Sequence, residues 1–178
     1  TLESGKLSYG MVRKGIFEQS DLQELEYIKE KMTDWYAKEK FVMFDHIRDF
    51  SNTAGEIRKF KPDVVFDDYL QLIQPHGIFD QRRLQLEQLV NDYKWVAKEN
   101  KCAVVLASQL NRAIETRADP IPQLSDLAES GAIEQVAENV FFVYYPHKVK
   151  PDKAQDNIIE VRAAKVRYGE TGRCELGF

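Results

Sequence analysis

Apolar residues recur along this chain with two different periods, and the changes of period mark the boundaries of predicted elements. In residues 20–40 they are spaced three and four apart, which is typical of an amphipathic helix. These apolar positions are Leu22, Leu25, Ile28, Met32, Trp35 and Tyr36. Ser20, followed three residues later by Gln23, predicts a capping box at the start of this helix. Residues 41–47 form a short, mostly apolar run and predict a strand.

The middle of the chain continues this alternation of helix and strand. Thr53 and Glu56 are expected to open a short helix that ends before Pro62, because proline cannot continue a helix. Residues 63–73 predict a strand, and residues 79–99 predict a long helix. One face of the long helix is expected to carry Leu86, Leu89, Val90, Tyr93 and either Val96 or Ala97.

The last part of the chain contains shorter elements and one polar loop. Residues 102–110 are largely apolar and predict another buried strand. Residues 111–123 are polar, include two prolines and predict a mobile loop. Residues 124–137 predict a helix that Gly131 interrupts. The remaining strands are expected at residues 139–146, 157–167 and 173–178, with a turn at 168–172.

The order of these elements predicts an α/β fold. Early strands alternate with helices and a hairpin closes the chain. This order is typical of a mainly parallel sheet flanked by helices, with a C-terminal antiparallel hairpin. Several strands are apolar on both faces, as a sheet covered by helices on both sides requires. At 178 residues the chain is about as long as one domain.

Composition and charge narrow the possible function classes. A hydrophobic content of 43% and a charged content of 30% are typical of a globular protein rather than a disordered chain. The net charge of −4 provides no global basic field, so a site for a polyanion must be local or formed by assembly. No apolar run reaches membrane-spanning length and no signal peptide is visible, so we expect no membrane association. Cys102 and Cys174 lie far apart without metal-ligand spacing, which favours a reducing, intracellular compartment.

Polar side chains follow two of the predicted strands. In "VVFDDYLQL" the carboxylates of Asp67 and Asp68 interrupt an apolar run, and Gln109 ends the strand predicted at 102–110. Because ligands bind beyond the carboxyl ends of parallel strands, Asp68 and Gln109 are expected to face the same crevice. One carboxylate together with a nucleotide phosphate suffices to bind Mg²⁺, which keeps several waters. From spacing alone, capping or hydration of the two acids remains the alternative to a metal site.

Four separated segments carry a family resemblance. They are "DDYLQLI", "ASQLNRAIETRAD", "SDLAESGAIEQVAENVFFVY" and "AAKVRYGETGRCELGF", in that order. Together they resemble the ATPase domain of the hexameric replicative DNA helicases of DnaB type, which has a RecA-like core. The resemblance covers residues 1–178, which would form a partial RecA-like helicase ATPase domain. It implies that ATP hydrolysis drives movement along single-stranded DNA and duplex unwinding by a hexameric ring.

The resemblance assigns roles to individual residues in hydrolysis. Glu3 in "TLES" matches the catalytic glutamate, which polarises the attacking water. Asp68 matches the Walker B aspartate, which binds Mg²⁺ through water. Asp67 stands where the family usually has an aliphatic residue, and in an alternating strand it is expected to point away from Asp68. Gln109 in "SQLNR" matches the residue that senses the γ-phosphate of ATP and couples it to the DNA-binding loops.

Two cations near the C-terminus have two readings. Lys165 and Arg167 alternate along a predicted strand and therefore share one face. From the residues alone, they fit an edge strand protected by positive charge. The resemblance implies instead that Arg167 is an arginine finger with Lys165 beside it, both reaching the γ-phosphate held by a neighbouring subunit. A planar guanidinium that stays charged suits this role.

The segment "SDLAESGAIEQ" resembles a loop and helix start along the central channel of these helicases. Backbone amides there are expected to bind phosphates of single-stranded DNA. The matching residues are Glu129, Ser130 and Gly131. Ala128 stands where the family commonly has arginine, which removes one expected phosphate contact. Arg112 and Arg117 in the preceding loop either compensate for it or are ordinary solvated charges.

One expected motif is missing, because no G-x-x-x-x-G-K-[ST] segment occurs. We therefore expect the P-loop, with its strand and helix, to lie upstream of residue 1, and we expect the isolated chain to be inactive. The resemblance also implies primase and a helicase loader as partners, and the cytoplasm of a bacterium or phage-infected host. Two alternatives remain. One is a recombinase-like or clock-type ATPase with the same core, and the other is a fragment without ATPase activity that acts as a binding module.

Overall fold

The structure of the protein is a computed structural model. It describes residues 13–15, 17–38, 40–77, 79–127, 131–149, 151–152 and 154–177. The chain divides into two compact units, Thr1–His46 and Ile47–Phe178. Within the described residues, no helix combines the length and the hydrophobicity needed to cross a membrane.

The first unit contains helix α2, Gln19–Ala37, which confirms the helix predicted over residues 20–40. The predicted capping box is wrong, because the backbone N–H of Glu18 donates to the carboxylate of Asp21 over 2.9 Å. The helix therefore begins one residue before Ser20, which lies inside the first turn. An acidic side chain in this position also interacts favourably with the positive end of the helix.

The strand predicted at residues 41–47 is wrong. Residues 41–44 have no regular secondary structure, and the backbone bends directly after them. A strand exists only where a neighbouring backbone accepts and donates its hydrogen bonds, and in the described part of the chain this segment has no such neighbour. The apolar pattern is that of a strand, but a pattern alone does not supply a pairing partner.

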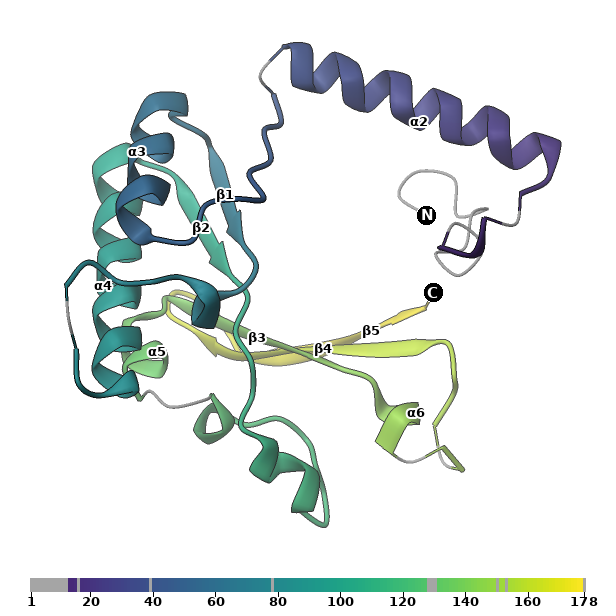
Figure 1. The fold of residues 1–178 in the computed structure, drawn as a ribbon. Helices are drawn as coiled ribbons and strands as arrows, with labels where there is room; N and C mark the ends of the chain where they lie inside the picture. Colours follow the sequence, from purple (N-terminus) through teal and green to yellow (C-terminus); the bar gives the residue numbers. More distant parts are fainter. Residues whose placement is uncertain are drawn as a thin grey trace. The chain divides into compact units, whose positions relative to one another are not determined.

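The second unit begins with two parallel strands and the helices that cover them. These elements are α3 (Phe50–Phe60), β1 (Val64–Asp67), α4 (Arg82–Asn100) and β2 (Ala103–Leu106). β1 and β2 pair in parallel, with Val64 opposite Ala103 and Asp67 opposite Leu106. α3 and α4 lie on the same side of this strand pair (Figure 1). A parallel pair joined by a helix is the arrangement predicted from the alternation of elements.

The hydrophobic core lies between α3, α4 and one face of β1 and β2. Its buried members are Phe50, Ala54, Ile57, Leu70, Ile73, Leu86, Leu89, Val90, Tyr93, Val96 and Ile133. This confirms the face predicted for the long helix and selects Val96 over Ala97, which is only half-buried. Phe50 and Tyr93 pack edge to face across the two helices, with ring centroids 4.9 Å apart.

Several element boundaries differ from those predicted. α3 begins three residues before Thr53, because the side chain of Asp49 accepts a hydrogen bond from the backbone N–H of Asn52 and caps the helix (2.9 Å). It ends before Pro62, as predicted. β1 ends at Asp67 instead of residue 73, because the chain then turns into a short 3₁₀ segment, η1 (Leu70–Leu72).

The outer face of the strand pair is exposed and apolar. Val64, Phe66 and Val105 alternate with residues that face the core, and Phe66 is 77% exposed. The sequence predicted helices on both faces of the sheet. In the part of the second unit that the structure describes, α3 and α4 cover one face only.

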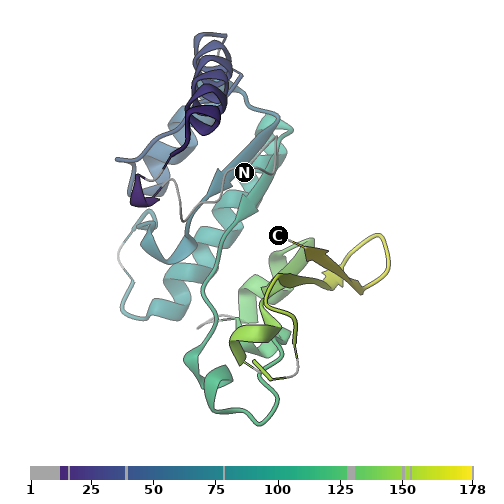
Figure 2. The same ribbon diagram turned by 90° about the vertical axis from the view of Figure 1, so that its right-hand side faces the viewer.

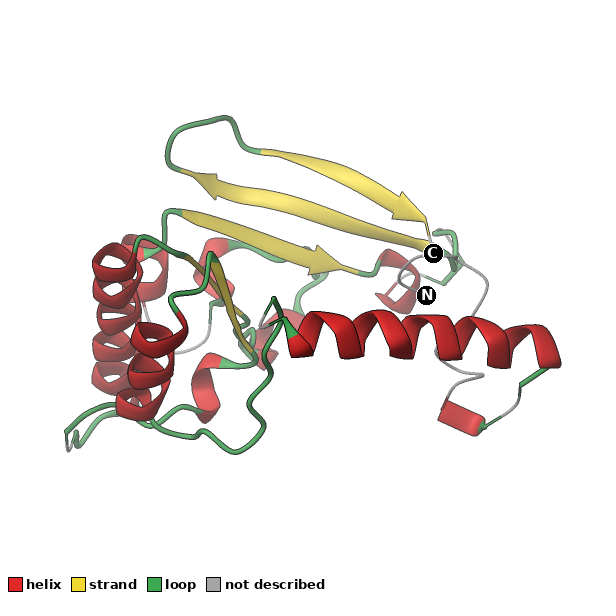
Figure 3. Ribbon diagram, turned by 90° about the horizontal axis from the view of Figure 1, so that it is seen from above, coloured by secondary structure: helices red, strands yellow, loops and turns green. Residues whose placement is uncertain are grey.

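The C-terminal part is a three-stranded antiparallel sheet in the order β3-β4-β5 (Figure 3). The elements of this part are η2 (Arg112–Thr116), η3 (Leu124–Asp126), α5 (Gly131–Val136), β3 (Asn139–Tyr144), α6 (Pro146–Val149), β4 (Ile158–Val166) and β5 (Gly172–Gly177). The turn that joins β4 and β5 is visible in yellow in Figure 2. The predicted parallel sheet and C-terminal antiparallel hairpin are thus both present, and β3 extends the hairpin to three strands.

The assigned core predicts that two leucines of α4 differ greatly in their contribution to the free energy of unfolding. Leu89 is fully buried, whereas Leu84 is 39% exposed on the same helix. We expect Leu89→Ala to lower the free energy of unfolding by about 2–5 kcal/mol, because it leaves a cavity. We expect Leu84→Ala to cost less than about 1 kcal/mol. Urea unfolding of the purified chain measures both values, and equal losses would contradict the assigned core.

Candidate functional site

The candidate site lies at the carboxyl ends of β1 and β2. The backbone N–H of Ala107 donates to the carbonyl of Asp67, and the N–H of Leu70 donates to the carbonyl of Ala107, each over 2.9 Å. These two bonds continue the parallel pairing beyond the strands. They bring the segment that carries Asp68 beside the segment that carries Gln109, as the sequence predicted. Both side chains are exposed.

Asp67 and Asp68 have different surroundings, because Asp67 is half-buried and Asp68 is exposed. The hydroxyl of Tyr93 on α4 donates a short hydrogen bond to the carboxylate of Asp67, which is half-buried beneath the helices. Burial raises the pKa of Tyr93 well above its usual range, and the hydrogen bond and charge of Asp67 raise it further. Tyr93 therefore stays protonated and remains a donor. Asp67 is committed to the core side, which leaves Asp68 as the carboxylate at the open edge.

Asp68 fits the metal-binding role expected for it. Its carboxylate is exposed and has no hydrogen-bond partner in the described ranges of the chain. Those ranges also contain no group of three or more His, Cys, Asp or Glu side chains that could hold a metal ion by themselves. One free carboxylate suits Mg²⁺ that is bound jointly with a nucleotide phosphate, and does not suit a metal held by protein ligands alone.

Arg167 and Lys165 both approach the end of α5, but they make different contacts. Arg167 directs one guanidinium nitrogen at both carboxylate oxygens of Glu138, each 2.8 Å away. Lys94 of α4 also pairs with Glu138 at 2.9 Å. Lys165 donates to the backbone carbonyls of Glu134 and Gln135, which lie at the end of the helix. Lys165 thus holds the helix end, while Arg167 is half exposed in a surface ion pair.

The charges in this cluster stabilise one another. Hydrogen bonds from Lys94 and then from Arg167 lower the pKa of Glu138 below its usual range. The same bond to Glu138 raises the pKa of Arg167. Glu138 therefore stays ionised and Arg167 stays charged at neutral pH. Spacing did not reveal this partner, because Glu138 and Arg167 are 29 residues apart and on different elements.

The two loop arginines differ in availability. Arg117 forms two hydrogen bonds to the buried carboxylate of Asp126, one of them 3.1 Å long, and a third to the carbonyl of Ile121. The bond from Arg117 lowers the pKa of Asp126. Arg112 is exposed at the start of η2. Of the two, Arg112 has the accessible side chain that a phosphate contact requires, while Arg117 holds the loop together.

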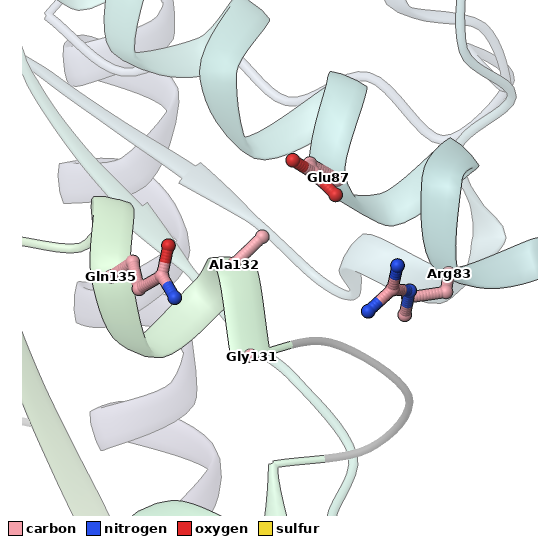
Figure 4. A pocket seen from close by; sticks show the side chains of 5 residues that line it. All are labelled: Arg83, Glu87, Gly131, Ala132 and Gln135. Atoms are coloured by element: carbon pink, nitrogen blue, oxygen red, sulfur yellow. The ribbon is translucent and has the colours of Figure 1, made fainter.

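Three predicted site residues lie outside the described residues, namely Glu3, Glu129 and Ser130, and so does Ala128. Gly131 opens α5 and lines a pocket against the start of α4 (Figure 4). The other residues of this pocket are Arg83, Glu87, Ala132 and Gln135. Arg83 is exposed and was not singled out from the sequence. It adds a cation beside the segment expected to face DNA.

The sequence of the chain is similar to that of known replicative DNA helicases. A family model described as the DnaB-like helicase C terminal domain matches residues 2–178. The chain belongs to this family. It is 38% identical over 115 residues to the replicative DNA helicase DnaB of Pasteurella multocida, which covers 65% of the chain and 25% of that protein. It is 39% identical over 133 residues to the replicative DNA helicase DnaC of Bacillus subtilis, which covers 72% of the chain and 29% of that protein.

Solved structures of the same family share the fold. A DnaB-like replicative helicase, studied in its interactions with primase, matches with a TM-score of 0.72 and 35% identity over 76% of the chain and 35% of that structure. A second solved structure, of an ATPase domain, matches with a TM-score of 0.70 and 36% identity over 74% of the chain and 48% of that structure. The chain spans about a quarter to a third of the curated relatives that it matches.

The pair of Asp67 and Tyr93 predicts a coupled effect on stability. We expect Tyr93→Phe to lower the free energy of unfolding by about 1–3 kcal/mol, because the half-buried carboxylate of Asp67 loses its donor. The double variant Tyr93→Phe with Asp67→Val should recover part of this loss, since no unpaired carboxylate remains. Urea unfolding gives the double-mutant cycle, and Tyr168→Phe, at a tyrosine that is 88% exposed, is the control. Additive losses in the cycle would show that the two groups do not interact.

Proposed function

We propose that this chain is part of the motor of a replicative DNA helicase that couples ATP hydrolysis to movement along single-stranded DNA and duplex unwinding. One observation carries the proposal. In a chain of the DnaB-like helicase family, Asp68 and Gln109 follow the carboxyl ends of adjacent parallel strands, where nucleotides bind in such sheets. The free carboxylate of Asp68 and the exposed amide of Gln109 then face one site.

The proposed roles in hydrolysis follow from side-chain chemistry. Asp68 holds Mg²⁺ through water, and the ion neutralises charge on the phosphates of ATP. Gln109 senses the γ-phosphate. Its side-chain amide suits this role, because it can donate a hydrogen bond to a phosphate oxygen and accept one from another group. Glu3 polarises the attacking water. Asp67 has no part in the reaction, because its carboxylate is directed at Tyr93 on the core side of the sheet.

The proposed ring places Arg167 in a second site. Arg167 lies directly after β4, far along the chain from Asp68, and is half exposed. In a hexameric ring it would reach the γ-phosphate held by the neighbouring subunit, with Lys165 beside it. A guanidinium can bind two phosphate oxygens at once through two of its nitrogens. In the structure a single nitrogen of Arg167 donates to both oxygens of Glu138.

The DNA-binding surface is proposed on the segment around α5. Glu129, Ser130 and Gly131 would present backbone amides to the phosphates, and Arg112 would add a cation. Arg117 contributes indirectly, since it fixes the loop through Asp126. Primase and a helicase loader are proposed partners of the assembled helicase in the cytoplasm of a bacterium or phage-infected host. A solved relative was studied in its interactions with primase.

The two neighbouring carboxylates give the first functional prediction. In a helicase subunit that contains this chain together with a P-loop, Asp68→Asn should weaken Mg²⁺-dependent ATP binding about tenfold or more, because it removes the metal ligand. Asp67→Asn should leave ATP affinity within about threefold of the unsubstituted protein. Glu3→Gln should keep ATP binding and abolish turnover. Titration with a fluorescent ATP analogue measures affinity, and equal losses in the Asp67 and Asp68 variants would refute the division of roles.

The second functional prediction concerns the subunit boundary. Arg167→Ala in the same helicase should lower the turnover of ATP by roughly 10³- to 10⁵-fold with little change in ATP affinity. The matched control is Arg173→Ala, which removes an exposed arginine from the same hairpin and should retain turnover. Mixed rings of Arg167→Ala subunits and P-loop-dead subunits should regain activity, because some interfaces combine both intact parts. Rings that exchange subunits and stay inactive would exclude a finger acting in trans.

A further inference from the structure

The side chain of Gln71 bridges the two strand ends of the candidate site. Gln71 lies in η1, three residues after Asp68. Its amide nitrogen donates to the hydroxyl of Ser108 over 3.0 Å, and its amide oxygen accepts from the backbone N–H of Gln109 over 3.3 Å. Patterns along the chain did not reveal this bridge, because the partners are 37 and 38 residues away.

This bridge restrains the backbone of Gln109 from one side. The backbone N–H of Gln109 donates to the amide oxygen of Gln71, and the hydroxyl of Ser108 lies 3.4 Å from the carbonyl oxygen of Gln109. The side chain of Gln109 itself is exposed and has no partner within the described residues. The backbone of Gln109 therefore determines where this side chain begins and which directions are open to it. The amide of Gln71 can hold both residues because it offers a donor to Ser108 and an acceptor to the N–H of Gln109.

The backbone of Gln71 is held from a different direction. Arg82, at the start of α4, donates a short hydrogen bond to the carbonyl of Gln71 and a second, 2.8 Å long, to the side chain of Gln85. The amide of Gln85 in turn donates to the carbonyl of Phe79 over 3.2 Å. Gln71 is also half-buried. The backbone that carries the bridging side chain is therefore held by hydrogen bonds, and this restricts the movement of the bridge.

We infer that Gln71 is a positioning residue that holds Gln109 in place relative to Asp68, so that sensing of the γ-phosphate depends on it. The inference rests on the proposed function. Misplacement of a reacting or sensing group by about 1 Å is enough to cost roughly a hundredfold in rate. Loss of the bridge should therefore reduce turnover while leaving the metal ligand, and with it ATP affinity, in place. A role confined to stability would instead lower the melting temperature without a selective effect on turnover.

The test uses a substitution that keeps the volume of Gln71 and removes its hydrogen bonds. In a helicase subunit that contains this chain together with a P-loop, Gln71→Met should lower the DNA-stimulated kcat for ATP by at least about tenfold, with KM within about threefold. Ser108→Ala, which removes one of the two bonds, should cause a smaller loss and serves if Gln71→Met does not fold. Gln88→Ala is the control, because Gln88 is exposed on α4 and its bond to Asp92 lies away from the bridge.

A double-mutant cycle decides whether Gln71 acts through Gln109. If it does, Gln71→Met should have no further effect on kcat once Gln109→Ala is present. A normal kcat for Gln71→Met, or an equal loss in both backgrounds, would overturn the inference. Wild-type turnover in Gln109→Ala alone would instead contradict the proposed role of Gln109, so the two failures are distinguishable.

Discussion

The candidate site depends on the parallel pairing of β1 with β2. Each strand has four residues, and the register is continued by the bonds from Ala107 to Asp67 and from Leu70 to Ala107. Because side chains alternate between faces, a slip of one residue would turn Asp68 toward the core and Asp67 toward solvent. The position of the carboxylate that is proposed to bind Mg²⁺ therefore rests on backbone hydrogen bonds, and these in turn rest on the apolar contacts of α3 and α4 with one face of the strands.

The pair of Tyr93 and Asp67 bears on the same register. Asp67 can bond to the Tyr93 hydroxyl only when its side chain points at α4. A buried polar pair contributes little net stability compared with apolar side chains of the same size, but it penalises arrangements that leave the carboxylate unpaired. This gives a physical meaning to an acid at a position where the family resemblance implies an aliphatic residue. The pairing opposes the slip that would exchange the two aspartates.

Elements with their own periodicity could be predicted from the sequence, and elements defined by a partner could not. The helix at 79–99 has a complete apolar face and was predicted within a few residues of its observed ends. The runs at 41–47 and 63–73 had equally strand-like patterns. The first has no paired strand in the described residues, and the second turns into η1 after Asp67, where its backbone bonds to Ala107. The residues at which a strand ends depend on backbone hydrogen bonds to distant segments, and local sequence patterns do not reveal these bonds.

The candidate site likewise has features that could be predicted from the sequence and features that could not. The neighbourhood of Asp68 and Gln109 was predictable, because strand ends in a parallel sheet meet at one edge. The roles proposed for them and for Arg167 rest on the family resemblance and not on spacing. The contacts of Glu138, Tyr93 and Gln71 were missed because the partner of each lies far away in the sequence. Of the three, Tyr93 alone had a chemical signal, because a buried tyrosine hydroxyl needs an acceptor.

The ion pair of Arg167 with Glu138 is compatible with the proposal that Arg167 contacts a phosphate bound to a neighbouring subunit. Both side chains are substantially exposed, and water and salt screen such pairs, so the bond is weak. A phosphate carries more charge than a carboxylate and offers the same paired oxygens, so it competes well for the guanidinium. Glu138 would not be left unpaired by this exchange, because Lys94 remains within 2.9 Å of it. The second cation therefore lowers the cost of separating Arg167 from Glu138. In the proposed ring, Arg167 would then pair with a phosphate of the neighbouring subunit without leaving the carboxylate of Glu138 unpaired.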